Sequence, residues 1–129
     1  MTTLGFYRTV IGETGQTNRE AVKRGVAAVF GALRDRLTPE ESQQVAAQLP
    51  RELKGVWLGG EVPGRKPVKM HRREFYERVK KDAGAKSIRE ARFLVIAVFA
   101  ALKEQLSPGE ADDIRSQLPK DLKEIWEDA

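Results

Sequence analysis

Apolar residues recur along the chain at helical spacing. Between residues 22 and 37 they fall at positions i, i+4, i+7, i+8, i+11 and i+15, which places them on one face of an α-helix. These residues are Val22, Val26, Val29, Phe30, Leu33 and Leu37. Gly25 and Gly31 interrupt this helix and each lowers helix propensity by about 1 kcal/mol relative to alanine. We attribute them to the close approach of a neighbouring helix.

The segment 28–57 recurs later in the chain as the segment 97–126. The offset is 69 residues throughout, and 14 of the 30 paired positions are identical. The aromatic pair at 6–7 recurs at 75–76 with the same offset, so the repeat reaches further back. We predict a single domain, 1–129, made of two repeat units and a connector. The units are 5–57 and 74–126, and the connector is 58–73.

Start and stop signals predict four helices in the first unit. We expect the first helix at about 3–13 and the second to begin after Asn18, whose side chain can cap it. Thr38-Pro39-Glu40-Glu41 is a start signal for the third helix, with Thr38 as the cap and Glu41 completing a capping box. Pro50 ends that helix and starts the fourth.

The second unit repeats these signals. We expect helices at about 71–83 and 87–106, and Ser107 with Glu110 repeats the capping box before the seventh helix. The segment 93–102 is apolar almost all round, and a helix of that kind is usually buried on all sides. We therefore expect the sixth helix to be central. The predicted fold is all-α, with about eight helices in two tandem four-helix repeats that share one core.

Composition narrows the class of protein. The chain has 129 residues and no cysteine, so it holds no disulfide framework and no thiolate metal site. The longest apolar run is ten residues, whereas about 20 are needed to cross a bilayer. We expect a cytoplasmic protein without membrane association. The net charge is +4, and the segment 64–92 concentrates positive charge, with 11 Lys/Arg against 4 Asp/Glu.

Several short motifs resemble one protein family. They include Leu-Arg-Asp-Arg-Leu at 33–37, Thr-Pro-Glu-Glu at 38–41, Gln-Leu-Pro at 48–50 and Gly-Arg-Lys-Pro at 64–67. With these, nearly the whole chain resembles the bacterial domain-of-unknown-function family numbered 2267. The resemblance implies a small all-helical prokaryotic protein with two related units. It implies no activity and no catalytic residues, since the motifs are mostly helix caps, prolines and leucines.

The sequence offers no catalytic constellation. His71 is the only histidine, and a general base or metal ligand needs partners at defined geometry. We interpret His71 as a residue at a helix start on a basic surface. Glu41 and Glu110 are interpreted as helix caps. We therefore expect no enzyme activity, no cofactor and no metal site.

Two groups of residues are candidates for binding. The candidate binding patch is Arg65, Lys66, Lys69, His71, Arg72 and Arg73. The candidate interface aromatics are Trp57 and Trp126, although their equivalent positions favour a place in the core of each unit. The preferred hypothesis is a non-enzymatic module that binds or scaffolds an unidentified protein through a helical groove or the connector face. The alternative is nucleic-acid binding through the segment 65–92, by neutralisation of phosphate charge.

Overall fold

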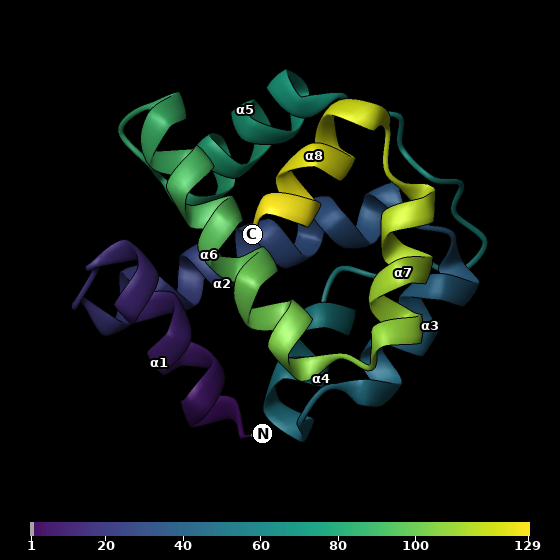
Figure 1. The fold of residues 1–129 in the computed structure, drawn as a ribbon, viewed down its shortest axis with the longest axis horizontal. Helices are drawn as coiled ribbons and strands as arrows, with labels where there is room; N and C mark the ends of the chain where they lie inside the picture. Colours follow the sequence, from purple (N-terminus) through teal and green to yellow (C-terminus); the bar gives the residue numbers. More distant parts are fainter. Residues whose placement is uncertain (1) are drawn as a thin grey trace.

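The computed structural model describes residues 2–129, and within them it contains eight α-helices and no strand (Figure 1). The all-α prediction is confirmed. The helices are α1 Thr3–Thr14, α2 Arg19–Arg36, α3 Pro39–Gln48, α4 Arg51–Leu58, α5 Arg72–Ala83, α6 Ile88–Gln105, α7 Pro108–Gln117 and α8 Lys120–Asp128. The bounds of α1, α2 and α3 recur in α5, α6 and α7 at the 69-residue offset.

The predicted helix starts agree with the structure. Asn18 caps α2 by accepting a hydrogen bond from the Ala21 N–H, and Thr38 and Ser107 cap α3 and α7 in the same way. Gly15 and Gly84 end α1 and α5 in the left-handed conformation, with φ of 71° and 70°. The sequence therefore sets where the helices begin and end through local hydrogen bonds.

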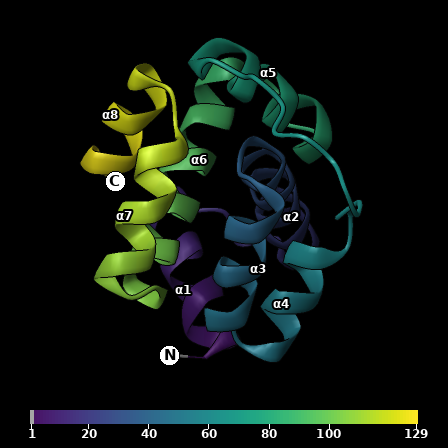
Figure 2. The ribbon, with the colours of Figure 1, turned by 90° about the vertical axis from the view of Figure 1, so that its right-hand side faces the viewer.

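The first helix of each unit packs on the long helix of the other unit. The helix α1 packs mainly on α6 of the second unit, whereas α5 packs both on α2 of the first unit and on α6 of its own unit (Figures 1 and 2). The first helix of each unit also makes an aromatic contact within its own unit. Phe6 contacts Phe30 at a ring-centroid distance of 5.6 Å, and Phe75 contacts Phe99 at 6.0 Å. The buried apolar residues of all eight helices form one cluster.

The expected burial of α6 on all sides is wrong for one side of the helix, where Leu94, Ile96 and Ala100 are partly exposed and Phe93 is exposed. The helix contacts α1, α2, α5 and α8, so helices of both units pack on it. Phe93, however, is 50% exposed, while Phe99 on the same helix is fully buried. The reason is that α2 and α6 cross near their N-terminal halves, and no helix covers the outer side of α6 at Phe93. The helix α2 also contacts both units and is equally central.

Gly25 allows α2 and α6 to cross closely. A Cβ atom at this position would lie 2.9 Å from both terminal methyl carbons of Leu94. This confirms the expected close approach of a neighbouring helix at Gly25. At Gly31 the nearest atoms to such a Cβ are Arg78 and Arg34 nitrogens at 3.6 and 3.7 Å, which is ordinary contact. No close approach of a helix backbone therefore requires Gly31.

Two glutamines join α3 and α7, which lie side by side (Figures 1 and 2). Gln48 at the end of α3 accepts the Ser107 N–H at 2.8 Å, and Gln117 at the end of α7 accepts the Thr38 N–H at 2.9 Å. These two N–H groups are the ones that a capping-box glutamate would bind. The predicted capping role of Glu41 and Glu110 is therefore wrong for their side chains, because glutamines of the other unit take their place.

The connector is irregular but fixed on the surface of α2. The Arg65 guanidinium donates to the carbonyl oxygens of Arg34 and Leu37, each at 2.7 Å, and forms an ion pair with Glu61. The Val68 N–H adds a hydrogen bond to the Asp35 carbonyl at 2.7 Å. Because the last carbonyls of a helix lack partners within the helix, Arg65 stabilises the C-terminal end of α2.

Candidate functional site

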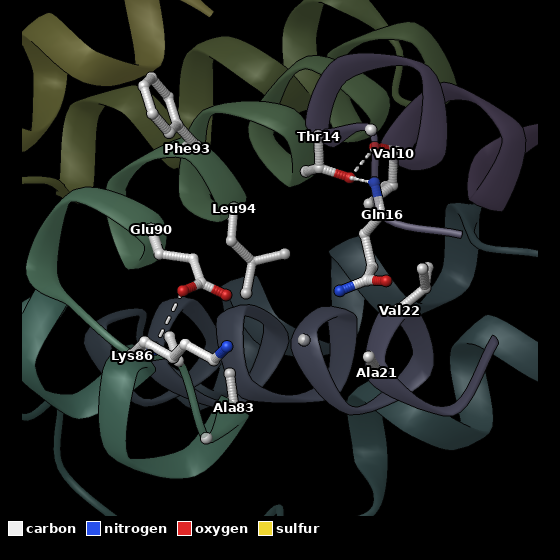
Figure 3. A pocket seen from close by; sticks show the side chains of 14 residues that line it. Val10, Thr14, Gln16, Ala21, Val22, Ala83, Lys86, Glu90, Phe93 and Leu94 are labelled. Carbon is white, nitrogen blue, oxygen red and sulfur yellow. Dashed lines mark hydrogen bonds between the residues drawn. The ribbon is translucent and has the colours of Figure 1, made fainter. Parts of the chain in front are cut away.

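A groove of about 500 Å³ lies between the α1–α2 loop and the α5–α6 loop (Figure 3). The two loops are equivalent by the 69-residue offset, since Gly15 ends α1 and Gly84 ends α5. The N-terminal halves of α2 and α6 form the base of the groove. A volume of this size is typical of binding sites for small molecules or for one or two side chains of a partner.

The base of the groove is apolar. Val10, Val22 and Leu94 line it, and Figure 3 shows the Leu94 side chain directed into the space from α6. Gly25 contributes backbone only, which leaves room for Leu94 to lie against α2. Because these side chains belong to the packed core or to its edge, the base is preformed.

Polar groups surround this base, and most of them are already bound. The Thr14 hydroxyl donates to the Val10 carbonyl at 2.8 Å and accepts the Gln16 N–H at 3.2 Å. The Glu90 carboxylate accepts the Lys86 N–H at 3.1 Å. The Lys86 ammonium lines the groove and forms no ion pair with any of residues 2–129. Lys86 therefore presents a positive charge to a ligand, and Glu90, which accepts only a backbone N–H, presents a negative one.

The rim carries an aromatic side chain that the repeat does not explain. Phe93 lines the groove with half of its surface exposed, and the Arg89 guanidinium lies 5.5 Å from the centre of its ring. The equivalent position of the first unit is Arg24, an exposed residue whose guanidinium donates to the Asp82 carbonyl near the end of α5 at 2.9 Å. The arrangement can hold an apolar side chain on the base and rim, with a neighbouring carboxylate on Lys86.

The structure divides the predicted basic patch. Arg65 is nearly buried and bound to Glu61 and to the end of α2. Burial raises the pKa of Glu61, but hydrogen bonds from Arg65 and Ser42 and the charge of Arg65 outweigh it and lower that pKa. Arg65 therefore acts within the fold and does not belong to an open surface.

The other patch residues lie along the connector and the start of α5. Arg73 pairs with Glu77 at 3.1 Å, and His71 lies 3.7 Å from the Asp121 carboxylate of α8. Lys66, Lys69 and Arg72 are exposed, and their side chains form no ion pair within the described residues. They do not line the groove.

Both tryptophans lie in the core. Trp57 is fully buried, stacks edge-on with Phe30 at 5.3 Å, and donates its indole N–H to Ser42. Trp126 is 2% exposed and stacks edge-on with Phe99. Each ring thus packs within its own unit, and neither contributes to the exposed surface of this chain.

One acidic cluster could hold a metal ion. Carboxylate oxygens of Glu41, Glu110 and Asp113 all lie within 4.8 Å of one another at the contact between α3 and α7. Burial and then the Glu41 carboxylate raise the pKa of Glu110 to about 8. The sequence pattern did not indicate this site, since its ligands come from two helices 69 residues apart.

The sequence held one signal for the groove. The positions of Arg24 and Gly25 in the first unit correspond to Phe93 and Leu94 in the second. The exposed aromatic ring and the Leu94 side chain at the base of the groove therefore belong to the second unit alone, since the first unit has arginine and glycine at these positions. Their exposure, however, follows from the crossing of α2 and α6.

The comparisons place the chain in one family. The sequence model of a family described as an uncharacterized conserved protein (DUF2267) matches residues 5–125. No curated protein matches the chain. None of the helices among residues 2–129 is long and apolar enough to cross a membrane. The family description names no ligand and no activity.

Proposed function

The chain belongs to the DUF2267 family of uncharacterized conserved proteins, and we propose that it is a non-enzymatic module that binds a partner protein. The docking site is the groove between the α1–α2 and α5–α6 loops. The occupant is an acidic peptide segment of the partner that presents one large apolar side chain. As part of the same proposal, the protein acts in the bacterial cytoplasm, which suits a chain without cysteine.

The exposed ring of Phe93 is the observation that carries this proposal. A phenylalanine with 50% of its surface in water, next to a groove with an apolar base, loses that hydration when a partner covers it. Aromatic residues are enriched among those that dominate protein–protein affinity. The corresponding arginine of the first unit indicates that the helix scaffold does not itself require an aromatic residue here.

Charge indicates the chemistry of the occupant. The Lys86 ammonium lines the groove, and Arg89 lies over the Phe93 ring. The carboxylate of Glu90 also lines the groove, and it accepts the backbone N–H of Lys86 but keeps its negative charge. Lys86 and Arg89 together outnumber Glu90 by one positive charge, and this excess favours a partner segment with a carboxylate next to its apolar anchor.

Selection from a library of random linear displayed peptides tests the proposal with the full-length chain as bait. We expect enriched peptides that combine a large apolar residue with acidic neighbours. Their affinity should fall about tenfold or more in the variants Phe93→Ala and Lys86→Glu. Ile88→Ala is the matched control, because Ile88 is an exposed apolar residue of the same helix that does not line the groove.

Two results would contradict the proposal. One is a selection that enriches no peptide above background. The other is a set of peptides that bind the Phe93→Ala, Lys86→Glu and Ile88→Ala variants as tightly as the original chain. Circular dichroism of each variant checks that its helices are intact.

Nucleic-acid binding is the second candidate, supported by Lys66, Lys69 and Arg72, which are exposed and have no ion-pair partner among residues 2–129. Its test is affinity for duplex and single-stranded nucleic acid as a function of salt. A steep fall of affinity with salt, and its loss when these three residues become glutamine, would support the candidate. Arg65 is left unchanged in this variant because it stabilises the end of α2. Binding that is weak, or unchanged in the variant, excludes it.

A further inference from the structure

Two glutamates meet where the two units touch. Glu41 in the first turn of α3 and Glu110 in the first turn of α7 occupy equivalent positions of the repeat. They are only 7% and 5% exposed, although each would ordinarily carry a negative charge. Burying two like charges side by side is unfavourable, so an arrangement of this kind requires a compensating group.

Neither glutamate has a cationic partner among residues 2–129. The N–H groups that a capping-box glutamate would accept are bound by Gln48 and Gln117. Oε2 of Glu41 and Oε1 of Glu110 are buried and have no hydrogen-bond partner among the described residues. Neither carboxylate forms an ion pair with a described lysine, arginine or histidine.

A third carboxylate lies beside this pair on its solvent-exposed side. Asp113 lies one turn after Glu110 on α7 and is exposed, and one of its oxygens is within 4.8 Å of oxygens of both glutamates. Two oxygens on opposite sides of a calcium ion are at most about 4.8 Å apart, because each lies about 2.4 Å from the ion. Magnesium binds its ligands at about 2.1 Å and gives up its water reluctantly, so a site with two buried protein ligands favours Ca²⁺.

We propose that Glu41, Glu110 and Asp113 form a binding site for a divalent cation the size of Ca²⁺. The two buried glutamates supply ligands from α3 and α7, and Asp113 supplies the third from the open side. Water completes the shell there, as is usual for calcium sites with few protein ligands. A bound ion compensates the buried carboxylates and links the two units across the contact between α3 and α7.

Without a cation, a proton takes part of this role. Burial and the neighbouring Glu41 and Asp113 carboxylates raise the pKa of Glu110 to about 8, so near neutral pH Glu110 holds a proton. The site is independent of the groove, so the two proposals can fail separately.

Titration calorimetry of the metal-free full chain with CaCl₂ tests the site, and MgCl₂ serves as the competitor. At pH 7.5 we expect one Ca²⁺ per chain with a dissociation constant below about 1 mM, weaker Mg²⁺ binding and a raised melting temperature. Glu41→Gln and Glu110→Gln should abolish the binding. Asp113→Asn should weaken it about tenfold. The control is Asp112→Asn, which removes a neighbouring exposed carboxylate outside the cluster.

The proposal is wrong if Ca²⁺ at about 10 mM produces neither heat nor a change in melting temperature. This concentration is well above the dissociation constants of weak extracellular calcium sites. It is equally wrong if Asp113→Asn and Asp112→Asn bind Ca²⁺ like the original chain, because binding would then lie elsewhere. Asp113 is exposed, so its variant should fold even if a change at a buried glutamate does not.

Discussion

Phe99 of α6 lies edge-on against Trp126 of α8, with 5.0 Å between the ring centroids and 65° between the ring planes. Both rings are buried, and Phe75 meets Phe99 from α5. Six residues earlier on α6, Phe93 has no such neighbour and is half exposed. The same helix thus presents one phenylalanine to the core and one to solvent.

This contrast predicts different costs for the same substitution. Phe99→Ala should lower the free energy of unfolding by about 3–5 kcal/mol, because it leaves a cavity among buried aromatic rings. Phe93→Ala should change it by less than about 1 kcal/mol, because no cavity forms at an exposed side chain. Urea denaturation of both variants measures the difference. Equal losses of unfolding free energy would mean that Phe93 and Phe99 are packed alike, which would contradict the exposure of Phe93 described above.

Arg65 and Lys66 are neighbours in the predicted basic patch but differ in structural role. Arg65→Ala should lower the free energy of unfolding by about 2–4 kcal/mol, because it removes hydrogen bonds to the end of α2 and leaves the Glu61 carboxylate without its ion-pair partner. Lys66→Ala should change it by less than about 0.5 kcal/mol, since Lys66 is exposed. Similar small changes in the free energy of unfolding for Arg65→Ala and Lys66→Ala would show that the connector does not stabilise the end of α2.

The Glu110 carboxyl should make stability depend on pH in a predictable direction. Its pKa is about 8 in the fold, above the usual value of 4.5. The folded state therefore binds the proton more tightly than the unfolded state, and this stabilisation is lost as the pH rises from about 4.5 through 8. Glu110→Gln keeps a neutral hydrogen-bond donor and does not titrate. In a chelating buffer, the free energy of unfolding of the variant, relative to that of the original chain, should rise by about 2 kcal/mol or more between pH 5 and pH 8.5.

The measurement is the difference in free energy of unfolding between the two proteins at each pH. Carboxylates with lowered pKa values, such as Asp35 and Glu61, titrate at lower pH in both proteins and cancel in the difference. A difference that stays constant from pH 5 to 8.5 would contradict the raised pKa of Glu110.

The packing of each first helix on the other unit predicts that one unit cannot fold alone. In a fragment of residues 1–60, α1 loses its contact with α6, and α2 loses its contact with α5. The fragment should show little helix by circular dichroism and no cooperative thermal transition. A cooperative melt would instead mean that the units are independent domains.

Helix identity and boundaries could be predicted because local rules determine them. The apolar spacing of α2, the caps Asn18, Thr38 and Ser107, and the proline at position 50 act within a few residues of the chain. The family resemblance was also available from such motifs, and the match over residues 5–125 confirms it.

The sites depended on contacts between distant segments, and the sequence could not reveal these. Glu41 meets Glu110 only because α3 lies against α7, and Gln48 caps α7 from the other unit. The carbonyls bound by Arg65 lie about thirty residues earlier, at the end of α2. Phe93 could not be distinguished from the buried apolar residues of α6 until the crossing with α2 was known.

The central claim is that the groove is the binding surface, and amide chemical-shift mapping tests it most directly. An acidic peptide enriched by selection is titrated into the ¹⁵N-labelled full chain. The account predicts shift changes concentrated in residues 14–17 and 84–87 and around Phe93 and Leu94, with little change along the connector 58–73. Changes confined to the connector, or to no contiguous surface, would contradict it.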